Sequence, residues 1–323
     1  MSRWLRNALT SVMCVAFVAG AAAQEWPTQP VHIVHAGGAG GGTDAMARLL
    51  GDALAKRLNT PVVIEAKPGA GTIVAAQAVT TAAPDGYRLF MSSVSTMAAT
   101  PWLYAKLPYD VTTSFESIAR LTLAPNALVA SNTLPVKDMN ELIAYGRANP
   151  GKLNLGSIGQ GTTSHLVGVA VARATGMEVA NVPYKSTAEL TLALSRGDIQ
   201  IAAQDLGGIL GQIKGGAMRP LAVTGDERHP ELPDVPTMKE LGIPSANLSV
   251  WFGLEAPAGT SPAVIERLAK AVADVMKDPE VIERYQRLGV RTAFMPTQEY
   301  TAFRLDELKR YEAIVAATGL EKR

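Results

Sequence analysis

The sequence predicts an α/β fold built from two domains, and three observations support this prediction. Short β-branched runs alternate with longer helical patterns along almost the whole chain, which is typical of βαβ units. About 300 residues follow an N-terminal apolar segment, a length that favours two domains over one. A glycine-dense loop follows the first expected strand, where α/β proteins commonly place a ligand site. We therefore expect two α/β domains with a cleft between them.

The expected strands are short apolar runs bounded by turn residues, and we expect them to form parallel sheets. In chain order they are Val31–Val34, Val62–Glu65, Tyr87–Met91, Ala127–Ala130, Leu153–Gly156, Ile199–Gln204 and Pro220–Val223.

Helices are expected between these strands because apolar residues recur at helical spacing over residues 49–58 and 264–275. Asp44 is a candidate cap for the first helix, and Ser261-Pro262 has the pattern of a helix start. A helix beginning at Asp138 should stop at Asn149-Pro150-Gly151.

The chain should cross twice between the two domains, within the β-rich segments 121–130 and 248–256. We predict that domain 1 comprises residues 24–123 and 252–323, and that domain 2 comprises residues 124–251. Domain 1 would then be built from both ends of the chain.

The first 23 residues have the pattern of a cleaved signal peptide. Arg3 and Arg6 precede an apolar stretch of residues 8–20, and Ala21-Ala22-Ala23 fits the small-residue cleavage rule. The stretch is too short to span a bilayer. We expect cleavage after Ala23 and a location in the periplasm.

Composition excludes several classes of function for the processed chain. The only cysteine, Cys14, lies in the leader, so disulfides and thiol catalysis are not expected. Removing Arg3 and Arg6 from the 30 basic residues leaves 28 against 29 acidic ones, a net charge of −1 with no long run of either sign. Binding to nucleic acid or to a membrane surface is not expected.

The strongest local feature is the glycine-rich loop of residues 35–44, between the first expected strand and the first helix. Its five glycines allow left-handed backbone and close approach to a ligand. Their amides, the N-terminus of the helix and the Thr43 hydroxyl together form a ready site for an anion.

Two enzyme interpretations of this loop compete with anion binding. A phosphate-transferring P-loop would need lysine where Thr43 stands. A dinucleotide fingerprint is matched by Gly40, Gly42 and Ala45, with Glu65 placed as the ribose-binding acid. Five residues separate the strand from Gly40, however, where the fingerprint requires a tight turn. An exported NAD-dependent oxidoreductase using the Gly40–Ala45 loop therefore stays an alternative.

A second loop, residues 156–165, repeats the order of strand, glycines, hydroxyls and helix. Two such loops facing each other would direct two helix N-termini at one anion, which favours a carboxylate. Ser157 is a poor nucleophile candidate, because its surroundings do not form G-x-S-x-G and no acid is placed to suggest a triad. An exported hydrolase is the other enzyme alternative.

The histidines and one aspartate are further candidates for site residues. His32, His35, His165 and His229 show no i, i+4 pairing and have no cysteine partners, so no metal site is expected. His35 and His165 belong to the two glycine loops, where each either donates to a ligand or caps its loop. Asp205 ends an apolar strand, where it either orients a ligand or caps the next helix.

An ordered series of short motifs then resembles the Bug family, the periplasmic solute-binding proteins of tripartite tricarboxylate transporters. The match covers essentially the whole processed chain. The motifs are Trp26-Pro27, the glycine-rich loop with Thr43-Asp44, Arg48-Leu49-Leu50, Glu65-Ala66-Lys67-Pro68-Gly69-Ala70-Gly71, Pro84-Asp85-Gly86-Tyr87, Gly161-Thr162 with His165-Leu166, Val182-Pro183-Tyr184-Lys185, Leu221-Ala222-Val223-Thr224, Leu232-Pro233-Asp234-Val235-Pro236-Thr237, Trp251-Phe252-Gly253-Leu254 and Ala256-Pro257-Ala258-Gly259-Thr260.

The resemblance implies a two-lobed periplasmic binding protein fold that captures a small carboxylate in its interdomain cleft, with no catalytic residue, cofactor or metal. It also implies delivery to a membrane permease of one large and one small subunit, and we expect a monomeric receptor. The ligand-binding residues it implies are Ala36, Gly37, Gly38, Gly40, Thr43, Asp44, Ser92, Ser93, Gly159, Gly161, Thr162, Thr163, His165 and Asp205.

The chain departs from the family pattern at one wall of this site. His35-Ala36-Gly37 stands where relatives often have aromatic or proline residues, which should widen the pocket. The identity of the carboxylate, whether aliphatic, aromatic or an amino acid, therefore stays open.

Overall fold

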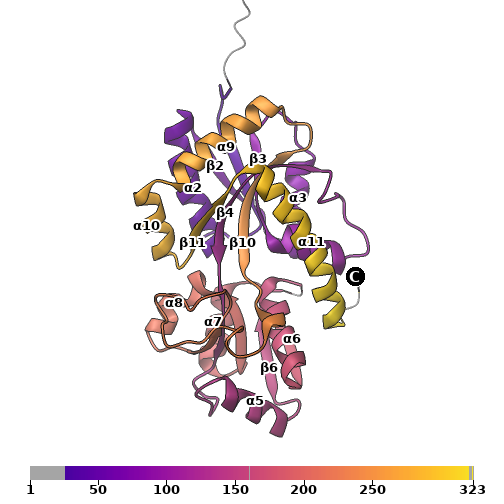
Figure 1. Ribbon diagram of the computed structural model, residues 1–323, viewed down its shortest axis with the longest axis vertical. Helices are drawn as coiled ribbons and strands as arrows, with labels where there is room; N and C mark the ends of the chain where they lie inside the picture. Colours follow the sequence, from indigo (N-terminus) through magenta and orange to yellow (C-terminus); the bar gives the residue numbers. More distant parts are fainter. Residues whose placement is uncertain (1–25, 160, 320–321, 323) are drawn as a thin grey trace, which may run out of the picture.

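The computed structural model describes residues 26–159, 161–319 and 322. The predicted leader, with Cys14 and the cleavage site, lies outside the described residues. Figure 1 shows two lobes stacked along the longest axis of the molecule, each built on its own β-sheet. We call them lobe 1 (residues 26–124 and 250–319) and lobe 2 (residues 126–249). The predicted α/β class is confirmed.

Lobe 1 is organised around a six-stranded sheet in the order β11-β4-β10-β3-β1-β2. Strand β1 pairs in parallel with β2 and β3, whereas β10 and β11 pair antiparallel with their neighbours. Its elements are β1 Val31–His35, α2 Gly42–Leu58, β2 Val62–Ala66, η1 Ala70–Thr72, α3 Ile73–Thr80, β3 Arg88–Ser93, η2 Ser95–Ala99, α4 Thr100–Leu103, β4 Phe115–Ala124, β10 Val250–Pro257, α9 Pro262–Met276, α10 Pro279–Arg287, β11 Arg291–Met295 and α11 Thr297–Thr318.

Lobe 2 is organised around a five-stranded sheet in the order β7-β6-β8-β5-β9. Strand β6 pairs in parallel with β7 and β8, and β5 pairs antiparallel with β8 and β9. Its elements are β5 Asn126–Ala130, α5 Met139–Ala148, β6 Leu153–Ser157, α6 Thr163–Thr175, β7 Val179–Pro183, α7 Thr187–Arg196, β8 Ile201–Asp205, α8 Leu206–Lys214, β9 Arg219–Val223 and η3 Pro244–Ala246.

The chain leaves the first sheet after β4, turns at Pro125 into β5, and returns to the first sheet in β10. Strands β4 and β10 are hydrogen-bonded neighbours, so both crossings lie side by side (Figure 1). The expectation of purely parallel sheets was wrong. Only the βαβ segments are parallel, and the strands next to the crossings run antiparallel because the chain reverses its direction there.

The helix ends follow local chemistry. Asp138 caps α5 by accepting a hydrogen bond from the backbone N–H of Glu141 at 2.9 Å, and α5 ends at Asn149 as expected. Ser261 caps α9, whose first position is a proline. The proposed capping role of Asp44 was wrong, because α2 begins at Gly42 and Asp44 lies inside its first turn.

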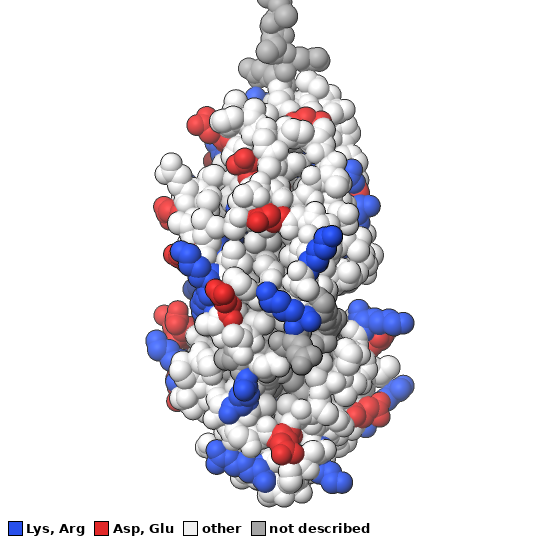
Figure 2. All heavy atoms as spheres, turned by 90° about the vertical axis from the view of Figure 1, so that its right-hand side faces the viewer, with Lys and Arg blue, Asp and Glu red and all other residues white. Residues whose placement is uncertain are grey.

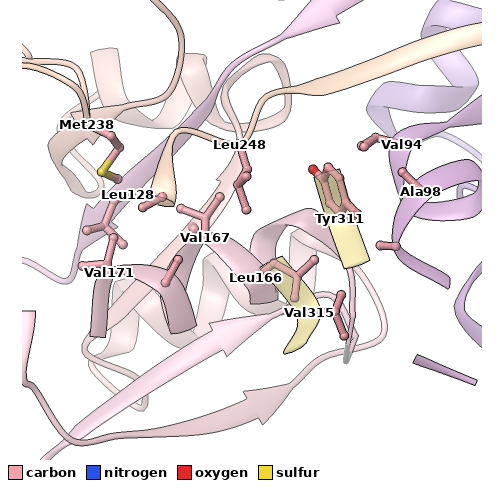
Figure 3. Packing of buried hydrophobic residues seen from close by; sticks show 14 of the residues in the cluster. Val94, Ala98, Leu128, Leu166, Val167, Val171, Met238, Leu248, Tyr311 and Val315 are labelled. Atoms are coloured by element: carbon pink, nitrogen blue, oxygen red, sulfur yellow. The ribbon is translucent and has the colours of Figure 1, made fainter. Parts of the chain in front are cut away.

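One apolar cluster runs through the boundary between the lobes. Figure 3 shows Val94 and Ala98 of lobe 1, Leu166 and Val167 of lobe 2, and Tyr311 of α11 in this cluster. Helix α11 belongs to lobe 1, but its C-terminal half extends to lobe 2 and packs on α6. The lobes therefore share buried surface in addition to their covalent connections.

Candidate functional site

The first glycine loop is shaped by the carboxylate of Asp44. This group accepts hydrogen bonds from the backbone N–H of Gly40 at 3.0 Å, from Nε2 of His35 at 3.0 Å and from Nε of Arg48 at 2.9 Å. The bond from Arg48 lowers the pKa of Asp44, so the carboxylate is charged at neutral pH. Asp44 thus folds the loop back onto its own helix.

His35 is fully buried behind this loop. A carboxylate can only accept, so Nε2 of His35 carries its proton towards Asp44. Burial lowers the pKa of His35, which keeps the ring neutral and leaves Nδ1 as an acceptor without a hydrogen-bond partner among the described residues. Gly37 is required beside it, because an added Cβ would lie 2.7 Å from Cβ of Thr43 and 3.4 Å from Nδ1 of His35.

The second loop is held by its own hydroxyl and imidazole groups. Thr162 is the N-cap of α6, and its hydroxyl donates to the carbonyl of Gly159 at 2.8 Å. His165 is buried, and its Nδ1 accepts from the backbone N–H of Gly161 at 3.0 Å. Of the two roles considered for His165, the structure shows loop capping. Gly159 and Gly161 both adopt left-handed φ values, 127° and 82°, which side chains rarely tolerate.

The two lobes meet through the starts of four helices. The hydroxyls of Ser95 in η2 and Thr163 in α6 lie 3.5 Å apart, and an added Cβ on Gly161 would lie 2.2 Å from Cδ1 of Leu103. The lobes also approach each other at the starts of α2 and α8. An added Cβ on Gly42, at the start of α2, would lie 4.0 Å from Oδ2 of Asp205, the residue that caps α8. Positive helix ends from both lobes therefore face one boundary.

Asp205 caps α8, which is one of the two roles considered for it. Its Oδ1 accepts a hydrogen bond from the backbone N–H of Gly207 at 3.1 Å. Burial raises the pKa of Asp205 to about 6. Its carboxyl group is therefore much closer to protonation at neutral pH than that of Asp44.

The two serines at the end of β3 face opposite sides of the sheet, because side chains alternate along a strand. The Ser92 hydroxyl is fully buried, donates to Oε1 of Glu255 at 3.1 Å and lies 3.2 Å from the hydroxyl of Tyr300. Ser93 is half-buried on the other side. Of this pair, Ser92 is tied into the core of lobe 1.

The structure brings together most of the predicted positions. Loop residues 36–44, 159 and 161–165 lie at the boundary with Asp205. The Ser92 hydroxyl is instead bonded to Glu255 and lies next to the hydroxyl of Tyr300. Sequence reasoning missed Ser95 and Leu103, which follow β3 and contact the second loop. Their position after the carboxyl end of a strand was the available signal.

The dinucleotide alternative loses its ribose-binding acid. Oε1 of Glu65 lies 2.7 Å from Nδ1 of His32, Oε2 is bonded to Arg88, and Lys67 Nζ lies 3.6 Å from Oε2. Glu65 is therefore engaged by three basic side chains of its own sheet edge.

The surface carries mixed charge. Figure 2 shows acidic and basic side chains interspersed over one side of both lobes, with no area of a single sign. Within the part of the chain that the structure describes, no helix combines the length and the apolar character needed to cross a membrane.

Comparison with known proteins gives the chain a clear set of relatives. The family model described as "Tripartite tricarboxylate transporter family receptor" matches residues 46–320. A UPF0065 protein of Bordetella pertussis is 34% identical over 317 residues, which are 98% of each chain. Protein BugT of the same organism is 29% identical over 320 residues, 99% of this chain and 98% of that protein.

Several solved structures are similar to this chain in both fold and sequence. The periplasmic binding protein BugD superposes with a TM-score of 0.86 at 31% identity, over 92% of this chain and 100% of that one. R. palustris Rpa4515 with adipate gives 0.88 at 29% identity, over 93% and 100%. MatC from Rhodopseudomonas palustris with bound malate gives 0.82 at 31% identity, over 90% and 100%.

Proposed function

The chain belongs to the tripartite tricarboxylate transporter receptor family, which includes the Bug proteins, and is a solute-binding receptor; we propose that it captures a small organic carboxylate between its lobes. The main support for this proposal is that helix N-termini of the two lobes lie next to each other, that of α2 near that of α8 and that of η2 near that of α6. Backbone amides at helix N-termini bind carboxylates without a buried cation. The adipate and malate complexes of the two R. palustris relatives support the same class of ligand.

The proposed mechanism is closure of the lobes around the ligand. A carboxylate that contacts both glycine loops at once favours the arrangement in which those loops are close together. The proposed contacts are residues 36–44, Ser93, 159, 161–163 and Asp205, and Thr162 and His165 also hold the second loop in shape. The predicted domain boundaries at 123/124 and 251/252 lie beside the two crossings between the sheets, and we propose these crossings, after β4 and before β10, as the flexible points.

The proposal extends to partners and location. The loaded receptor would act in the periplasm after cleavage behind Ala23, as a monomer, and would deliver its ligand to a permease of one large and one small subunit. It would catalyse no reaction. The engagement of Glu65 by His32 and Arg88 supports binding over NAD-dependent chemistry.

The test is thermal unfolding of the processed protein with a panel of small carboxylic acids. A ligand at 100 times its Kd stabilises the folded state by about 2.7 kcal/mol. Thr43→Val and Thr163→Val should abolish the shift given by the binding acid. Thr60→Val, beyond the opposite end of α2, should preserve it. A shift with NAD and with no acid would refute the proposal.

A further inference from the structure

The two oxygens of the Asp205 carboxylate have different surroundings. Oδ1 accepts from the backbone N–H of Gly207 at 3.1 Å and so caps α8. Oδ2 faces the other lobe, where an added Cβ on Gly42 would lie 4.0 Å away. Capping therefore uses one oxygen and leaves the other directed at the first turn of α2, beside the glycine loop that we propose binds the ligand carboxylate.

No charged side chain in the described part of the chain compensates Asp205. The ends of β1 and α2 that border the first glycine loop carry His35, Asp44 and Arg48, and the histidine and the arginine are both bonded to Asp44. At the end of α10, the carbonyl of Leu288 lies against Gly207, and the neighbouring Arg287 is bonded to Glu283. Arg291, at the start of β11, is exposed. Neither a basic group nor another acid contributes to the pKa shift of Asp205, whose causes are burial and the bond from Gly207.

Two consequences follow for a ligand whose carboxylate lies at the start of α2. The loop amides satisfy that carboxylate, but Oδ2 of Asp205 offers only an acceptor next to it. A hydroxyl or ammonium on the adjacent carbon can donate to this oxygen, and such charge-assisted bonds are strong. A ligand without that donor leaves the half-buried carboxylate of Asp205 next to another carboxylate, which is unfavourable while both are ionised.

We propose that Asp205 is a specificity-determining residue that selects acids with an O–H or N–H donor on the carbon next to the clamped carboxylate. This inference rests on the proposed carboxylate-binding function and adds the class of carboxylate. Such acids are 2-hydroxy or 2-amino acids, and the shared feature that Asp205 recognises is the donor.

The experiment uses three acids of one carbon skeleton: succinate without a donor, malate with a hydroxyl and aspartate with an ammonium group. Isothermal titration at pH 7.5 measures each Kd for the wild type and for Asp205→Asn. Asparagine caps helices as well as aspartate does, so α8 is preserved and the folded state stays testable. Asp138→Asn, at the cap of α5, is the matched control.

We expect at least one donor-bearing acid to bind the wild type about tenfold or more tightly than succinate, and Asp205→Asn to reduce that preference by about tenfold. Asp138→Asn should leave it unchanged. The stronger response of malate or of aspartate identifies the donor. Succinate should also bind the wild type more tightly as the pH falls through about 6, and Asp205→Asn should weaken this dependence.

The inference is overturned if Asp205→Asn leaves both preferences within twofold of the wild type, or if the wild type binds unsubstituted acids such as succinate or adipate with no advantage for malate or aspartate. In either case the carboxylate function stands. Failure of every acid in the wider panel to bind would overturn the proposed function as well.

Discussion

Gly207 and Gly289 form a further contact between the lobes, where α8 meets the loop after α10. An added Cβ on Gly207 would lie 2.1 Å from the carbonyl oxygen of Leu288, and one on Gly289 would lie 2.6 Å from Cα of Gly207. Both obstacles are backbone atoms, which cannot rotate away. We therefore predict that Gly207→Ala prevents the lobes from reaching their present arrangement.

The magnitude follows from the geometry. An ordinary contact begins near 3.4 Å, so the two segments must separate by about 1.3 Å. Overpacking of this kind costs about 1–3 kcal/mol. If the ligand needs the present arrangement and the cost falls on that arrangement alone, ligand affinity should fall by about 5-fold to 150-fold. The free protein should unfold at the same or a higher temperature, since alanine favours a helix over glycine by about 0.5–1 kcal/mol.

The neighbouring glycine supplies the control. An added Cβ on Gly208 would lie 3.5 Å from Cγ2 of Thr187, an ordinary contact, so Gly208→Ala should bind ligand like the wild type. Titration calorimetry measures the affinity, and small-angle scattering with and without ligand measures the arrangement of the lobes. Wild-type affinity together with wild-type scattering for Gly207→Ala would refute the reasoning.

Three further predictions concern stability. Burial raises the pKa of Glu255 in the folded protein above its unfolded value of 4.5. The contribution of Glu255 to stability should therefore fall as the pH rises from 4.5 towards the folded pKa. Glu255→Gln should flatten the pH dependence of the melting temperature, and an unchanged profile would contradict this. Gly253→Ala would place its Cβ 1.9 Å from the Tyr300 hydroxyl, and the free energy of unfolding in urea should fall by about 3 kcal/mol, a loss below about 0.5 kcal/mol counting against it. Leu166→Ala in the cluster shared by the lobes should cost about 2–5 kcal/mol, while Leu192→Ala, at a side chain 50% exposed, should cost far less; equal losses in the same urea titration would show that the cluster is not tightly packed.

Much of the fold was predictable because its buried strands are continuous apolar runs. All seven expected strands are present with ends shifted by one or two residues. Strands β4 Phe115–Ala124 and β10 Val250–Pro257 were expected only as parts of the β-rich segments 121–130 and 248–256. Strands β7 Val179–Pro183 and β11 Arg291–Met295 were missed, since both lie at sheet edges and are only half-buried, which removes the apolar signal. Helix α11 was also missed, because it packs on more than one element and its apolar residues do not form a single stripe.

The site was predictable as two loops but not as a set of contacts. Glycines and hydroxyls after strands are visible in the sequence, whereas the bonds from His35 and Arg48 to Asp44 depend on how the loop folds back. The partners of Ser92 were not predictable either. Phe90 and Ser92 share one face of β3, and Met91 and Ser93 share the other. Both Phe90 and Met91 are buried, so alternation along the strand does not tell which serine is bonded within lobe 1.

The position of β10 has a consequence for the order in which the exported chain folds. In lobe 1, β3 and β4 are joined only through β10, so the first 124 residues contain two separate parts of a sheet and no complete lobe. Every strand of lobe 2 lies within residues 126–223. A chain that leaves the export machinery with its N-terminus first can therefore complete the second sheet first. Until then β3 has an unpaired edge, because its partner β10 lies more than 150 residues further along the chain.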